Sequence, residues 1–168
     1  MPKIIENLQE RLIEEARKQI EAVGYSGLTI RSVAKACGVG VGTVYNYFPS
    51  KDALLATFLL ADWQKCIDAI HQVAQKTDDP AQVLLCIYTQ LQSYTRRHEV
   101  IFLNPAASGA KADSSGRYHD LLRGQLAAPL RRFCTDDFTA EFLAESLLVW
   151  TIAGKSFDEI FGVIQKLF

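Results

Sequence analysis

Apolar residues recur at intervals of three and four along most of the chain, and two short stretches of this kind flank Gly38. The apolar positions of the first stretch are Ile30, Val33, Ala34 and Cys37, and those of the second are Val41, Val44, Tyr45 and Phe48. This spacing places such residues on one side of a helix. A glycine between them supplies the turn conformation that other residues adopt at a cost. The pattern therefore predicts two packed short helices joined by a glycine turn, which is the form of a helix-turn-helix DNA reader.

The second short helix has a polar side as well as an apolar one. If Val41, Val44 and Phe48 point inward, the outward residues are Gly42, Thr43, Asn46 and Tyr47, with Tyr45 at the flank. Small, hydroxyl and amide side chains suit the base edges and phosphates of DNA. Burial of the whole segment is the alternative, and it would leave an amide and two phenols in need of partners.

The rest of the chain also follows the helical period, and no stretch alternates as a half-buried strand does. A first helix is expected at about residues 4–23, and Thr29 is expected to cap the next one. Residues 104–116, rich in small and polar side chains, are expected to form a loop. The other expected helices run from Ser50 to Gln75, from Asp79 to His98, from Tyr118 to Cys134 with Pro129 tolerated or at a kink, from Phe138 to Ala153, and from Ser156, where Glu159 completes a capping box.

Charge is distributed unevenly, although the formal net charge is only -1. Between residues 22 and 51 the charged residues are Arg31, Lys35 and Lys51, whereas residues 52–168 hold eleven basic and fourteen acidic side chains. A locally positive segment on a mildly acidic body is what attraction to phosphate at one end requires. Chance clustering of three charges is the alternative.

The sequence offers little for catalysis, metal binding or membrane insertion. It has no nucleophile elbow, phosphate-cradling glycine loop or metal-ligand cluster, so we expect no enzymatic reaction, catalytic residue, metal or cofactor. The four cysteines stand singly on apolar helix faces and are expected to be buried thiols. The apolar runs are shorter than the ~20 residues of a membrane helix, and no export signal precedes the first helix. A cytoplasmic location is expected.

The run GLTIRSVAKACGVGVGTVYNYFPSKDALL, residues 27–55, resembles the N-terminal domain of the TetR family of transcriptional regulators. The matching features are Thr29, the alanine and glycine residues around the turn, the segment Thr43–Phe48, and Lys51 followed by an acid and a leucine. The resemblance covers about residues 4–58. Two positions depart from the family pattern: Tyr47 stands where histidine is commoner, and Gly42 ends a glycine-rich segment where a polar side chain often stands.

This resemblance implies an all-α protein with an N-terminal three-helix helix-turn-helix DNA-binding domain, residues 1–50, and a C-terminal helical domain for ligand binding and dimerisation, residues 51–168. It implies a palindromic double-stranded DNA operator as partner. In such a complex Arg31 would bind a guanine and Asn46 an adenine. The expected DNA-contacting residues are Thr29, Arg31, Gly42, Thr43, Tyr45, Asn46, Tyr47 and Lys51.

The same resemblance implies a homodimer and a small-molecule effector. The last two helices are unusually apolar, and the expected dimer interface is Phe142, Leu147, Trp150, Phe157, Ile160, Phe161 and Ile164, with burial within the chain alone as the alternative. The candidate effector pocket is Phe58, Trp63, Tyr88, Gln92, Tyr94, Phe102, Tyr118 and Trp150, with plain aromatic core as the alternative. The function expected is a repressor that leaves its operator when the ligand shifts the helix from Ser50 to Gln75. The alternative is a ligand-independent DNA-binding or protein-interaction module.

Overall fold

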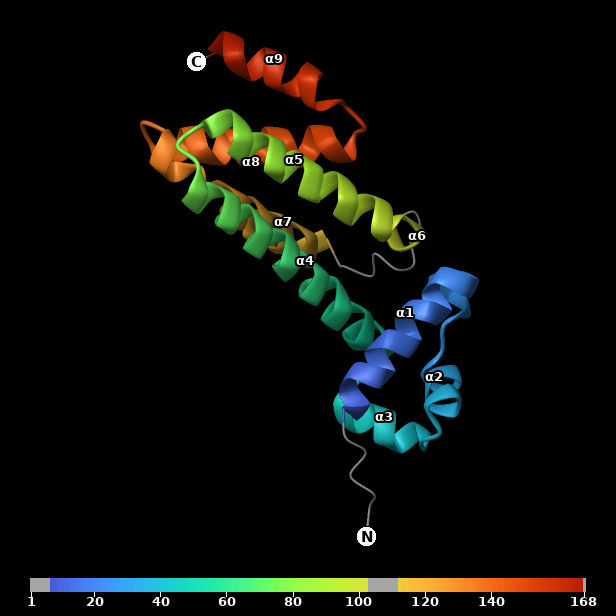
Figure 1. Cartoon of the computed structure of the whole chain (residues 1–168). Helices are drawn as coiled ribbons and strands as arrows, with labels where there is room; N and C mark the ends of the chain where they lie inside the picture. The colour runs from blue at the N-terminus through green and yellow to red at the C-terminus, as the bar shows by residue number, and fades with distance from the viewer. Residues whose placement is uncertain (1–6, 103–111, 168) are drawn as a thin grey trace. The chain divides into compact units, whose positions relative to one another are not determined.

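The computed structural model describes residues 7–102 and 112–167, where all regular elements are helices, which confirms the all-α fold (Figure 1). In these residues no helix is both long and apolar enough to cross a membrane. The elements are α1 (Leu8–Gly27), α2 (Ile30–Cys37), α3 (Val41–Tyr47), α4 (Lys51–Lys76), α5 (Pro80–Arg97), α6 (Glu99–Phe102), α7 (Ala112–Ala127), the 3-10 helix η1 (Arg131–Phe133), α8 (Asp137–Ile152) and α9 (Phe157–Leu167).

The chain divides into two compact units. The N-terminal unit comprises Met1–Asp62 and His98–Gly109, and the C-terminal unit comprises Trp63–Arg97 and Ala110–Phe168. Because the division falls inside α4, this one helix contributes residues to both units. The functional domains expected at residues 1–50 and 51–168 stay a prediction.

The N-terminal unit has a continuous apolar core. Helix α1 contributes Leu8, Leu12, Ala16 and Ile20, and residues of α2, α3, α4 and α6 also belong to the core. At Gly24 the backbone leaves the helical conformation, with φ 72° and ψ 175°, so the expected end of the first helix appears as a break inside α1. The start expected at residue 4 lies outside the described residues.

Side-chain caps begin several helices where the sequence predicts them. The Thr29 hydroxyl accepts a hydrogen bond from the Ser32 N–H at 3.0 Å, and Ser32 Oγ accepts one from the Thr29 N–H at 3.2 Å. Ser50 Oγ accepts the Ala53 N–H at 3.1 Å. The other predicted caps are Asp79 on Ala81 and the reciprocal pair of Ser156 and Glu159. Asp136 also caps α8 through the Thr139 N–H, which was not predicted. These bonds satisfy amides that the helices leave open.

A left-handed glycine separates α2 from α3. Gly38 has φ 71° and ψ 31°, its N–H donates to the Lys35 carbonyl, and the Val39 N–H donates to the Ala34 carbonyl at 3.0 Å. This pattern terminates a helix and redirects the chain within two residues. The predicted glycine turn is confirmed.

A buried ion-pair cluster ties α1 to α4 and to the residue before α6. Asp62 and His98 are 1% and 3% exposed. The Arg17 guanidinium donates to both carboxylate oxygens of Asp62, at 2.5 and 3.2 Å, and His98 Nε2 lies 3.2 Å from the same carboxylate. The hydrogen bond to Asp62 raises the pKa of Arg17. Arg17 also lies over the Phe58 ring, 5.1 Å from its centre.

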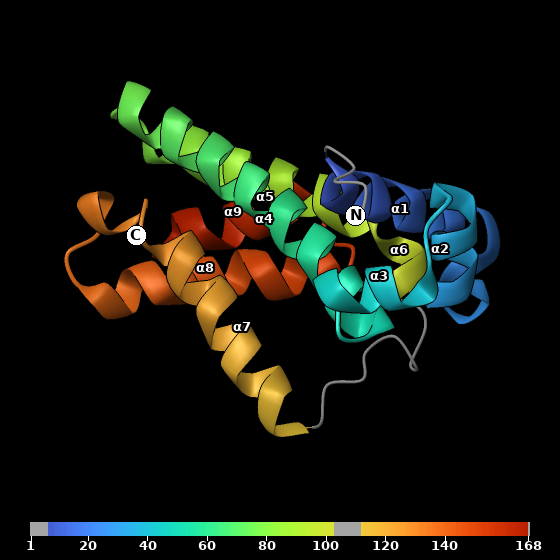
Figure 2. The same cartoon turned by 90° about the horizontal axis from the view of Figure 1, so that it is seen from below.

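In the C-terminal unit α8 packs against both α5 and α7 (Figures 1 and 2). Two expectations are wrong here. Residues 112–116, expected in a loop, form the start of α7, while residues 104–111 lie outside the described part. The helix expected to reach Cys134 ends at Ala127, because Pro129 lacks the N–H that a helix interior needs, and η1 follows.

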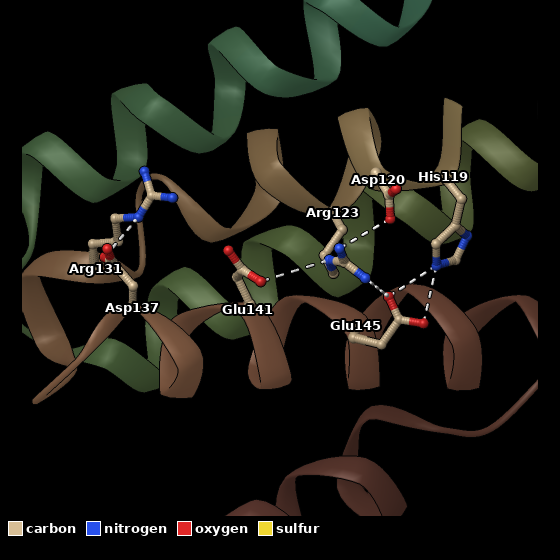
Figure 3. A network of polar contacts seen from close by, with 7 residues as sticks. All are labelled: His119, Asp120, Arg123, Arg131, Asp137, Glu141 and Glu145. Carbon is tan, nitrogen blue, oxygen red and sulfur yellow. Dashed lines mark hydrogen bonds and ion pairs between the residues drawn. The ribbon is translucent and has the colours of Figure 1, made fainter. Parts of the chain in front are cut away.

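Charged side chains join α7 and η1 to α8 in a row (Figure 3). His119 Nε2 lies 2.9 and 2.8 Å from the two carboxylate oxygens of Glu145, and Arg123 lies between Glu141 and Glu145 at 3.9 Å from each. Arg131 pairs with Asp137 at 3.1 Å. These groups are partly solvated, so each pair is worth at most about 1 kcal/mol, and the row orients α7 rather than anchoring it.

We predict that Gly38→Ala lowers the free energy of unfolding by about 1–2 kcal/mol. No atom lies within 4 Å of an added Cβ, so the cost comes from the positive φ alone. Gly38→Asn should lose less, because asparagine tolerates this conformation better. Urea unfolding followed by circular dichroism measures both, and equal stability of wild type and Gly38→Ala would contradict the argument.

Candidate nucleic-acid interface

Helix α3 is anchored to the N-terminal unit by two side chains. Val44 is 0% and Phe48 2% exposed, and both belong to the apolar core formed with α1, α2 and α4. Val41, also expected to point inward, is 36% exposed because it is the first residue of the helix and lies at the edge of a hollow. The prediction is wrong for Val41 and confirmed for the other two.

The opposite side of α3 is open. Gly42 and Asn46 are exposed, Tyr45 and Tyr47 are about half exposed, and Thr43 is half-buried. An added Cβ at Gly42 meets nothing within 4 Å. The face therefore presents an amide, two phenols and a bare segment of backbone, as the sequence predicts. That these groups contact DNA stays a prediction.

A hollow of about 610 Å³ lies beside α3, where α2 and α4 begin. Its lining includes Thr29, Arg31, Tyr45 and Lys51, four of the residues expected to contact DNA. The start of a helix carries partial positive charge from its open N–H groups, and it attracts anions. Two such starts and two cationic side chains make this region favourable for phosphate.

Lys51 is held in place by a residue that sequence reasoning missed. Its Nζ donates to the Tyr25 carbonyl at 3.0 Å and lies 3.8 Å from the centre of the Tyr25 ring. The Tyr25 hydroxyl in turn donates to Asp52, and burial, with this bond, raises the pKa of Tyr25 to about 12. An ammonium group has three donors, so Lys51 keeps capacity for a phosphate. The sequence feature that could have indicated the role of Tyr25 is its position as an aromatic residue directly after Gly24.

The Thr29 side chain already accepts a hydrogen bond within the protein, whereas the Arg31 side chain is exposed. The Thr29 hydroxyl already serves as the cap of α2, so a phosphate would share it with the Ser32 N–H. Arg31 is exposed on the second residue of α2. Its planar guanidinium is suited to two parallel hydrogen bonds with a guanine edge.

The residues expected to form one effector pocket are dispersed. Phe58 lies in the core of the N-terminal unit. In the C-terminal unit Trp63 packs edge-on against Tyr94 and donates to Gln125 at 2.6 Å. The Tyr88 hydroxyl donates to the Lys155 carbonyl and accepts from Gln92. The side chains of Phe102 and Tyr118 lie outside the described part of the chain.

Trp63 and Tyr94 are in contact, as are Tyr88 and Gln92, but that the set binds an effector stays a prediction. Helical spacing identified the inward face of each helix, but the aromatic side chains on those faces pack against different neighbours. Trp150 lines a hollow of the C-terminal unit, about 470 Å³ in volume, between α8 and α9.

Of the residues expected at the dimer interface, some are exposed and others are buried within the chain, and the interface itself stays a prediction. Phe142 and Trp150 are 42% and 50% exposed, whereas Leu147, Ile160 and Ile164 are buried within the chain itself. Phe157 and Phe161 are half-buried and stack on each other at 5.1 Å. The large exposed apolar side chains of α8 and α9, here called the α8–α9 face, are Phe138, Phe142, Val149, Trp150, Ile152 and Val163.

Residues 12–57 match the family described as bacterial regulatory proteins, tetR family. The uncharacterized HTH-type transcriptional regulator YuxN of Bacillus subtilis (strain 168) is 35% identical over 72 residues, 43% of this chain and 25% of that protein. The HTH-type transcriptional regulator PksA of the same organism is 29% identical over 126 residues, 71% of this chain and 62% of that protein. The chain thus matches less than two thirds of the length of either relative.

Solved structures extend the similarity in fold. Thermus thermophilus FadR, a TetR family transcriptional repressor in complex with lauroyl-CoA, has a TM-score of 0.66 and 21% identity, over 95% of this chain and 92% of that one. The TetR family transcriptional regulator PfmR from Thermus thermophilus has a TM-score of 0.56 and 22% identity, over 85% of each chain. These structures show the same fold.

We predict that Gly42→Ala separates stability from DNA binding. Alanine is favoured over glycine by about 1 kcal/mol in a helix interior and by less in the first turn, where Gly42 lies. The added methyl group meets no atom of the chain, so the free energy of unfolding should rise by a fraction of this amount. If Gly42 lies against DNA, the methyl group should weaken binding. Unfolding and fluorescence-anisotropy titrations measure the two effects, and unchanged DNA affinity would show that position 42 faces away from DNA.

Proposed function

The chain belongs to the TetR family of transcriptional regulators, and we propose that it is a homodimeric repressor that releases a palindromic operator on binding a small molecule. The observation that carries the proposal is the exposed polar side of α3, which stands opposite the buried pair Val44 and Phe48. A short helix docked in this way can place its outer side chains in the major groove.

The proposed DNA contacts divide into two kinds. Asn46 on α3 and Arg31 on α2 read base edges, as amide and guanidinium groups can. Thr29, Thr43, Tyr45, Tyr47 and Lys51 bind phosphates, and the position of three of them around the hollow at the starts of α2 and α4 supports this. Gly42 allows the backbone of α3 to approach the duplex closely.

The α8–α9 face supports the proposal of a homodimer. Six large apolar side chains are exposed on two adjacent helices, and burial of such a face in a partner removes its contact with water. A two-fold dimer places two copies of α3 on two half-sites of a palindrome.

Release by a ligand is proposed to act through α4. This 26-residue helix is continuous and contributes residues to both units. A ligand that favours another position of α4 must bind the DNA-free protein more tightly than the DNA-bound protein. A ligand-independent regulator on the same fold is the alternative, and equal ligand affinity with and without operator would favour it.

We propose binding rather than catalysis as the activity, and the cytoplasm as the place of action. Support comes from the relatives named above, which are transcriptional regulators. In the described residues no group of three or more histidine, cysteine or acidic side chains is placed to hold a metal ion.

We predict that Asn46→Ala weakens binding to an operator selected from random DNA by about 1–3 kcal/mol and relaxes preference at one base pair. The operator is first selected with the wild-type chain, and each base pair is then varied against both proteins in anisotropy titrations. A uniform loss on all sequences would assign Asn46 to the DNA backbone instead. Failure to select any sequence would count against the proposed function itself.

We predict that Phe142→Asp dissociates the dimer and weakens operator binding, because a charge would be buried in an apolar interface. Leu85→Asp is the matched control, since Leu85 on α5 is 46% exposed but lies outside the α8–α9 face. Sedimentation velocity measures the assembly. A dimer that persists in Phe142→Asp, or dissociates equally in Leu85→Asp, would contradict the proposed interface.

A further inference from the structure

A second hollow of the C-terminal unit has the properties of a ligand site. It encloses about 570 Å³ between the first turn of α5, η1, the start of α8 and the end of α9. Small-molecule sites are usually concave spaces of this size, largely apolar, with a few polar groups at defined positions. None of the residues expected for the effector pocket lines this hollow.

Its interior is apolar and rigidly placed. Leu84, Leu130, Leu143 and Ile164 line it and are buried, each coming from a different segment of the unit. Phe133 and Phe161 add aromatic surface and are half-buried. An occupant would therefore remove mainly carbon from water.

The polar side chains of the lining are uncharged, and two of them donate hydrogen bonds to the Asp136 carboxylate. Thr135, Thr139 and Gln165 line the hollow, and both threonine hydroxyls donate to the Asp136 carboxylate at 3.1 Å. Backbone and hydroxyl hydrogen bonds lower the pKa of Asp136, so it is ionised at neutral pH. The described lining contains no lysine, arginine or histidine. Such a rim accepts hydrogen bonds and repels anions.

We propose that this hollow binds an uncharged, mainly apolar small molecule that carries a hydroxyl or another hydrogen-bond donor. The donor end contacts the threonine oxygens, and the apolar body fills the space above the buried aliphatic side chains. The exposed α8–α9 face contributes no residue to the lining, although Phe161 and Ile164, both expected at the dimer interface, do line the hollow. A second copy as the occupant is therefore an outcome that the labelling experiment below must exclude. The consequence for DNA rests on the proposed function, whereas the binding itself does not.

Cys134 allows the site to be probed directly. It lines the hollow and is half-buried, and Cys86 on α5 is half-buried but does not line it. Burial raises the pKa of both thiols, and Asp136 raises that of Cys134 further. Iodoacetamide labelling of the full chain at mildly alkaline pH, read by peptide mass spectrometry, follows the two thiols in one sample.

The probe is 1-decanol, with decanoate as its charged counterpart. We expect 1-decanol to slow the labelling of Cys134 several-fold and to leave Cys86 unchanged. Decanoate should require a higher concentration for the same protection, since its carboxylate would lose water beside a lining whose described residues supply no cationic side chain. Absence of protection by 1-decanol, equal protection of both thiols, or equal potency of decanoate would each overturn the proposal.

A filled hollow provides the second test. Thr139→Phe places a ring in the space and should abolish protection by 1-decanol, while Thr89→Phe, on an exposed part of α5, should retain it. Ala81→Phe fills the hollow from another helix if Thr139→Phe does not fold, as judged by circular dichroism. The proposed site would be overturned if 1-decanol still protected Cys134 in a folded filled variant. It would also be overturned if, without 1-decanol, Cys134 labelling slowed as protein concentration rose, because a second copy of the chain would then cover the hollow.

The link to DNA is measured separately. Operator affinity is titrated with and without 1-decanol for the wild type and the folded filled variant. Loss of affinity in the wild type alone supports an effector role. If 1-decanol binds at the hollow without changing operator affinity, the effector role is overturned but the proposed binding site is retained. If the protein binds no operator at all, that result contradicts the proposed function and not the binding site.

Discussion

The orientation of α3 depends on the burial of Val44 and Phe48. Each fully buried apolar side chain of this size contributes about 1.5–3 kcal/mol, and the helix has only seven residues, so these two contacts decide which way it faces. Residues four apart share one side of a helix. Gly42 and Asn46 are therefore turned outward together. This packing therefore determines which side chains of α3 are on its surface. Interactions among the surface residues do not determine it.

The remaining parts of the N-terminal unit hold the surface against which α3 docks. The reciprocal cap of Thr29 and Ser32 fixes the start of α2, and Gly38 fixes its end. The pair of Arg17 and Asp62 then ties α1 to α4. Such a buried pair adds little stability over an apolar substitute, but removal of one partner leaves an uncompensated charge and costs several kcal/mol. It therefore constrains where α4 lies on α1 more than it strengthens the fold.

Local features of this chain could be predicted from its sequence, because their causes lie within a few residues. The caps at Thr29 and Ser50 and the turn at Gly38 are of this kind, and the structure shows each of them. The partners of Tyr88, Trp63 and Lys51 could not be predicted, since they lie between 26 and 67 residues away along the chain. Helical spacing tells which side of a helix is buried and not what covers it. The neighbours of the residues proposed for the effector pocket could not be predicted for this reason, and their role in ligand binding stays a prediction.

The small number of base-reading groups proposed for one copy is consistent with the proposed homodimer. Beside the bare Gly42, the proposed readers in one copy are Asn46 and Arg31, and a good pair of hydrogen bonds to a base discriminates by about 1–3 kcal/mol. One copy thus provides about 2–6 kcal/mol. Specific regulators bind their sites about 4–10 kcal/mol more tightly than other DNA. One copy reaches only the lower part of that range, whereas two copies on a palindrome would double the discrimination. The few proposed base-reading groups of α3 and the exposed α8–α9 face therefore support the same proposal, a homodimer.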